Sequence, residues 1–162
     1  MPETLHDHQV TRRLRWETFF VALIAACLYV PATRFGLIWD DPIWYGNIAH
    51  LSVLDLFGPV RTFHFYRPLA LLYSQLFVDA AGVVHPLLQH VGQVLFHAAN
   101  AALCVVLAGR LGLTRWCAAF VGLVFALHPY VQQAVAWQVP PQPLATLAML
   151  VVVLTAMRYL EQ

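Results

Sequence analysis

The sequence predicts an all-α integral membrane protein with about four transmembrane helices and a long external loop after the first of them. Three observations lead to this fold class. The chain is 60% hydrophobic and 10% charged, with a mean hydropathy of +0.67, which leaves too few charges to cover a soluble domain of this length. Its apolar segments are about as long as a bilayer is thick. Arginines flank these segments at alternate ends, as the positive-inside rule requires.

The first span is expected over residues 16–30, behind a polar cytoplasmic tail at 1–15. An apolar run after a basic segment is also typical of a lipoprotein signal, and residues 24–27 loosely resemble its cleavage box. Cleavage there would leave apolar residues 28–30 without a membrane, so a span is favoured. The arginines that place the tail inside are Arg12, Arg13 and Arg15.

The long external loop is expected over residues 36–84. Within it, residues 69–81 predict a helix of about four turns, because Pro68 suits the first helical position and Gly82 follows the end. This helix is too short to span a bilayer and carries polar side chains. We therefore expect it to lie in the outer membrane interface.

Three further spans are expected over residues 86–108, 116–127 and 144–156, the second of them continuing less apolar to residue 137. Between the last two, residues 139–143 contain three prolines and predict a tight external turn. Both termini are then cytoplasmic. The basic residues that fix the inner ends of these spans are Arg110, Arg115 and Arg158.

The tryptophans agree with this topology, and residues 16–162 are expected to form a single membrane domain. Indole rings concentrate at the two membrane–water interfaces. Trp16 and Trp116 fall at the inner interface, whereas Trp39, Trp44 and Trp137 fall at the outer one.

Composition also bears on partners. A net charge of +1 without a basic stripe gives no sign of a nucleic-acid partner. The three cysteines lie in apolar stretches without metal-ligand spacing, and neither a metal nor a cofactor is expected. Membrane lipid and other membrane subunits are the expected partners.

The acidic pair Asp40 and Asp41 follows the first span directly and has two interpretations. In the simpler one, Asp41 caps an interfacial helix with Pro42 at its first position. In the functional one, a carboxylate at the mouth of a span acts as a general base, because burial and a neighbouring like charge raise its pKa. The two interpretations are compatible if one aspartate caps and the other is free.

Three further side chains are expected to gather with this pair at the outer face. Arg67 is suited to hold a phosphate through two hydrogen bonds, and its alternative role is an interfacial anchor. His128 precedes Pro129, so its default role is a helix terminus with the imidazole bonded to backbone. Gln133 lies one turn further along. Together they suit a substrate that is half lipid and half polar.

His90 and His97 raise a separate possibility. They lie seven residues apart on one expected helix and share a face. Neutral imidazole inside a membrane can ligate haem or chlorophyll magnesium. Neighbouring glutamine and asparagine residues make the polar strip broader than a ligand pair, which favours interhelical hydrogen bonding.

These residues together resemble the GT-C glycosyltransferases, and most of all the tetratricopeptide-containing O-mannosyltransferase group and its bacterial relatives. The resemblance covers nearly the whole chain from about Arg12. It implies sugar transfer from a polyprenyl-phosphate donor on the outer face. The matching segments are Trp39-Asp40-Asp41 with Asn47, Tyr66-Arg67-Pro68-Leu69, His90 with His97, and His128-Pro129 with Ala134-Val135-Ala136-Trp137.

By position, the resemblance implies that Asp40 or Asp41 is the base that deprotonates the acceptor, and that Arg67 lies near the lipid phosphate. Two departures weaken this. Gln133 stands where the family usually has an acidic residue, and residues 140–143 lack the usual arginine and aspartate. With only four expected spans, they favour a truncated or catalytically degenerate module that serves as a membrane subunit of a larger complex. An active N-terminal portion of a transferase and a pigment- or haem-binding subunit are the alternatives.

Overall fold

The computed structural model describes residues 14–58, 66–137 and 142–162, and helices dominate these ranges. The one β feature among them is an isolated antiparallel bridge between Val78 and Val84. In chain order the elements are α2 (Arg15–Tyr29), η1 (Val30–Arg34), α3 (Asp41–Ile48), η2 (Asp55–Phe57), α4 (Pro68–Gln75), α5 (Pro86–Arg110), α6 (Arg115–Leu127), α7 (Pro129–Ala136) and α8 (Gln142–Leu160).

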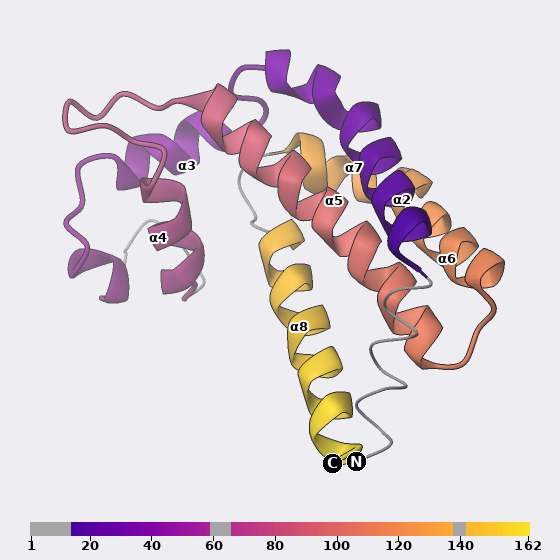
Figure 1. The fold of residues 1–162 in the computed structure, drawn as a ribbon. Helices are drawn as coiled ribbons and strands as arrows, with labels where there is room; N and C mark the ends of the chain where they lie inside the picture. The colour runs from indigo at the N-terminus through magenta and orange to yellow at the C-terminus, as the bar shows by residue number, and fades with distance from the viewer. Residues whose placement is uncertain (1–13, 59–65, 138–141) are drawn as a thin grey trace.

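The longest helix, α5, lies in the middle of a bundle and packs against α2, α6 and α8 (Figure 1). Three continuous segments in the described part of the chain are long and apolar enough to cross a membrane: α2 with η1, α5, and α8. Helices α6 and α7 make a fourth crossing if this bent pair is counted as one span. The chain is therefore a multi-pass α-helical membrane protein, as the sequence predicts.

The bend between α6 and α7 measures 47° and has a local cause. His128 lies at the break with extended backbone, φ −63° and ψ 124°. Its successor is Pro129, whose ring disfavours helical backbone in the preceding residue. The predicted third span thus exists as two helices rather than one.

Close packing of α6 against its neighbours depends on Gly122. A Cβ atom there would lie 2.4 Å from Val105 Cγ2 of α5 and 3.0 Å from Val21 Cγ1 of α2. Small residues at such contacts let helix backbones approach within a membrane. The buried residues of this core are Leu14, Val21, Ala25, Ala98, Ala101, Val105, Ala108, Ala118 and Ala126.

Two ion pairs mark one end of the bundle, which we call the arginine end. Arg115 Nε lies 3.8 Å from Glu17 Oε1, and Arg110 Nη1 lies 3.7 Å from Glu161 Oε2. These pairs join α6 to α2, and α5 to the last residues of the chain. The sequence places these same arginines on one side of the membrane, and the structure brings them together.

At the opposite end, α3, η2 and α4 form a small module beside the first turns of α5 (Figure 1). Its core buries Trp44, Tyr45, Ile48, Leu56, Ala70 and Leu71. Trp44 Nε1 donates a hydrogen bond of 3.0 Å to Ser74 Oγ, and Gln75 Nε2 donates to the carbonyl oxygens of Ile48 and Leu51. We call these elements the loop module, because they occupy the predicted long loop.

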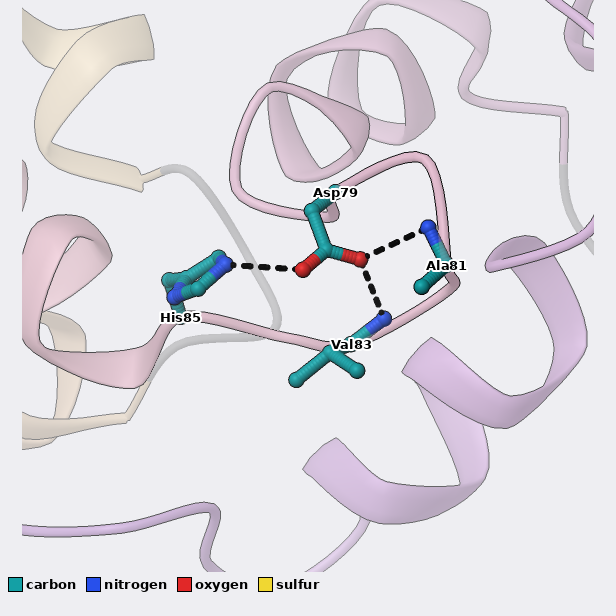
Figure 2. A network of polar contacts seen from close by, with 4 residues as sticks. All are labelled: Asp79, Ala81, Val83 and His85. Carbon is teal, nitrogen blue, oxygen red and sulfur yellow. Dashed lines mark hydrogen bonds and ion pairs between the residues drawn. The ribbon is translucent and has the colours of Figure 1, made fainter.

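The helix predicted over residues 69–81 is shorter than expected, since α4 ends at Gln75. Asp79 explains the early end. Its Oδ1 accepts hydrogen bonds of 2.9 Å from the backbone amides of Ala81 and Val83, and its Oδ2 lies 3.3 Å from His85 Nε2 (Figure 2). A short carboxylate that binds nearby amides favours a turn over a helix.

The predicted proline turn lies partly outside the described residues, which omit 138–141. Its last two residues, Gln142 and Pro143, belong to the first turn of α8 rather than to a turn. The last helix therefore begins two residues earlier than predicted and ends four residues later. Proline is compatible with this position because the first turn of a helix has no intrahelical partners for its amides.

Candidate functional site

The acidic pair lies at a sharp corner between η1 and α3, and Trp39 carries the unusual geometry. Trp39 has φ +51°, the one positive φ among the described residues other than glycine. A bulky side chain in this left-handed region is strained by roughly 1–2 kcal/mol. Such strain concentrates at functional sites, where the surrounding structure holds it in place.

Hydrogen bonds across the corner stabilise the strained backbone at Trp39. The backbone amide of Ile38 donates to Asp41 Oδ2 at 2.9 Å, and the amide of Asp41 donates to the carbonyl oxygen of Ile38 at 2.9 Å. The backbone carbonyl oxygen of Asp40 accepts a hydrogen bond from the amide of Trp44. Hydrogen bonds therefore join the residues before and after the corner, and Asp40 lies at its apex.

The two carboxylates occupy opposite environments. Asp41 is fully buried, whereas Asp40 is exposed and its carboxylate has no hydrogen-bond partner within the described ranges. The helix-capping prediction was wrong in its detail: Asp40 rather than Asp41 precedes the helix, and the Asp40 side chain caps no amide of its first turn. Asp41 instead holds the amide of Ile38, on the other side of the corner.

Asp41 belongs to a buried polar cluster with two tyrosines and a serine. Burial raises the pKa of Tyr45; a hydrogen bond with Ser74 opposes this rise, and the charge of Asp41 adds to it. Burial raises the pKa of Tyr73 to about 12. Both phenols therefore stay protonated at neutral pH, beside a carboxylate that lies between the corner and the core of the loop module. Sequence reasoning missed this cluster, because it forms between helices.

A tryptophan from the far end of the chain meets the corner. The rings of Trp39 and Trp137 lie 5.4 Å apart at 79°, an edge-to-face contact. Trp137 follows the last residue of α7, and its amide donates to the carbonyl oxygen of Gln133 at 3.0 Å. Gln133 is exposed one turn earlier on the same helix. The structure thus brings the end of α7 that carries Gln133 to the acidic corner.

His128 and Arg67 lie at the starts of two other helices, α7 and α4. His128 directly precedes α7, and its Nδ1 accepts a hydrogen bond of 3.2 Å from the amide of Tyr130, which confirms the predicted helix-terminus role. The length of α7, roughly 10 Å, separates it from Trp137. Arg67 is exposed and precedes α4, about two turns from the Ser74 end that contacts α3.

A groove lies between α2, η1 and α7. Its volume is about 360 Å³, and apolar side chains such as Leu28, Phe35 and Leu127 line it. Ala136, next to Trp137, forms its end on α7. The size is within the range of small-molecule and cofactor sites. This apolar groove, whose end at Ala136 adjoins the tryptophan that contacts Trp39, suits the apolar part of an amphiphile.

The polar strip on α5 turns inward. Each of its members is at most 1% exposed: Gln89, His90, Gln93, His97 and Asn100. His97 Nε2 lies 3.3 Å from the carbonyl oxygen of Ala126, and Asn100 Nδ2 donates to that of Pro143 at 2.8 Å. Interhelical hydrogen bonding is therefore confirmed for these two residues.

The ring of His97 is enclosed by protein. It lies 4.8 Å from the ring of Tyr29 and stacks at 5.5 Å on Phe125. Within the described ranges, no three histidine, cysteine, aspartate or glutamate side chains are placed to hold a metal ion. These contacts support a packing role for His97.

No family model, no curated protein and no solved structure matches the chain.

Proposed function

We propose that this chain is the membrane module of a GT-C-type glycosyltransferase, with Asp40 as the base on its outer face. One observation carries the proposal. Of two adjacent aspartates, the structure buries Asp41 as an anchor of the corner and leaves the carboxylate of Asp40 exposed, at the apex of a strained turn. A general base must reach the proton that it removes, and Asp40 is the carboxylate of this pair that solvent and substrate reach.

The chemistry follows from that placement. Asp40 takes the proton of an acceptor hydroxyl, whose oxygen forms a bond to the anomeric carbon of the sugar. The bond between that carbon and the phosphate oxygen breaks, and the phosphate leaves on its lipid. The groove between α2, η1 and α7 accommodates part of the polyprenyl chain. Arg34 and Arg67 are exposed arginines on this side of the bundle and are suited to the departing phosphate.

The proposed topology puts the loop module and Asp40 outside and the arginine end in the cytoplasm. Its support is the charge distribution: Arg110, Arg115 and Arg158 all fall on the side of the predicted cytoplasmic tail. Polyprenyl-phosphate donors and their acceptors would then meet on the face where Asp40 is exposed.

The test is a transfer assay with a polyprenyl-phosphate sugar, using the chain purified together with its membrane partners. Asp40→Asn should lower turnover by roughly 100-fold or more, the contribution typical of a general base. Asp55→Asn is the matched control, because it removes an exposed carboxylate from the same module. Equal turnover in the two variants, or none in the wild type, would reject the catalytic role and favour the degenerate membrane subunit.

A further inference from the structure

The arginine end contains a second groove, between α2 and α5, which the proposed function does not use. Its volume is about 590 Å³. Thr18 and Ala22 of α2 face Ala102 and Val106 of α5, so small side chains open the space between the two helices. Phe19 completes the apolar wall. From Arg15 to Ala22 the groove follows α2 for roughly 10 Å, from the membrane interface into one leaflet.

The mouth of this groove is positively charged. Arg15 lines it, is exposed, and forms no ion pair among the residues that the structure describes. The two described acidic side chains at this end are already paired, Glu17 with Arg115 and Glu161 with Arg110. Glu17 is also largely buried, with 12% of its side chain exposed. No described carboxylate therefore neutralises Arg15.

Trp16 supplies the third element, since its indole lines the groove and is 71% exposed. Tryptophan prefers the headgroup level, where its ring is buried in apolar surroundings and its N–H finds a polar acceptor. An apolar slot, a cation and an interfacial indole at one mouth match an acyl chain, a phosphate and the ester region of a phospholipid. They match an apolar helix less well, because it would leave Arg15 without a counter-charge.

We propose that the groove binds one acyl chain of an anionic phospholipid from the leaflet at the arginine end, with Arg15 bound to its phosphate. The site is independent of sugar transfer at Asp40, and each can fail without the other. One arginine near a membrane surface gives a preference of about 1 kcal/mol for an anionic lipid, which is about fivefold.

Native mass spectrometry tests this site on the full chain extracted from vesicles of phosphatidylglycerol and phosphatidylcholine in equal amounts. The wild type should retain phosphatidylglycerol about fivefold over phosphatidylcholine. Arg15→Gln should bring this ratio close to one, and Arg15→Lys should keep it. Ala102→Phe fills the groove and should reduce retention of both lipids.

Ala148→Phe is the matched control, because it adds the same volume on the exposed face of α8. It should retain lipid as the wild type does. Equal retention of the two lipids by the wild type, or undiminished retention in folded Ala102→Phe, would overturn the proposal. Should Ala102→Phe fail to fold, the ratio in Arg15→Gln decides alone, since that exposed side chain lies outside the core.

Discussion

The carboxylate of Asp79 binds three of the ten residues that connect α4 to α5. Backbone hydrogen bonds from Val83 and Ala81, together with nearby His85, keep the pKa of Asp79 below the ordinary carboxyl value (Figure 2). A lowered pKa means that the folded turn binds its proton less readily than the unfolded chain does. Its stabilising contribution is therefore present above the unfolded pKa and is lost as the pH falls through the folded one.

We expect the amide protons of Ala81 and Val83 to report this titration. In an NMR pH series their shifts should change together with a midpoint below 3.8, the ordinary value for aspartate. Asp79→Asn should abolish the change. A midpoint at or above 3.8 would show that the two amides do not stabilise the charged carboxylate.

The acidic corner shows how far residue-level prediction reaches. The sequence singles out Asp40 and Asp41, because adjacent charges after a span are unusual. It does not separate their roles, since Asp41 becomes buried and approaches Tyr45 only when the chain folds. The strained backbone of Trp39 is likewise invisible in a sequence that shows no glycine there.

Among the elements, the spans were predictable and their interruptions were not. Apolar length and flanking arginines predict α2, α5 and α8 within a few residues. The early end of α4 at Gln75 depends on the side chain of Asp79. In the sequence, Asp79 fits the polar face of an amphipathic helix, so the helix was expected to continue past it. The break of the third span at His128 was predictable in part, because Pro129 favours the first position of a new helix.

The packing of α6 gives a prediction at this scale. Gly122→Ala should destabilise the protein by about 1–3 kcal/mol, because its Cβ collides with Val105 and the backbone of α5. Gly46→Ala is the matched control in α3, where nothing lies within 4 Å of the added atom. It should be neutral or stabilising by up to about 1 kcal/mol. Thermal unfolding in detergent measures both, and equal melting temperatures would contradict the close packing.

For the whole molecule, the fold follows from α5. Its buried strip of amides and imidazoles needs partners on several sides, and α2, α6 and α8 surround it. The sequence indicates the strip, but it does not show which helix supplies the hydrogen-bond partner of each polar side chain. Asn100, for example, bonds to Pro143, a residue that sequence reasoning assigned to an external turn.

Orientation is testable with two single-cysteine probes. Cys27, Cys104 and Cys117 are first replaced by alanine. A cysteine at Ser52, in the loop module, should react with an impermeant maleimide added to intact cells, whereas one at Gly112, between α5 and α6, should react only after lysis. The reverse pattern would place Asp40 in the cytoplasm and remove the outer-face mechanism.

The bend at His128 links two properties that are otherwise unrelated. One short helix, α7, supplies both the wall of the groove at Ala136 and, just beyond its end, the indole that meets Trp39. A change in the angle between α6 and α7 would therefore move the groove wall at Ala136 together with the ring that contacts Trp39.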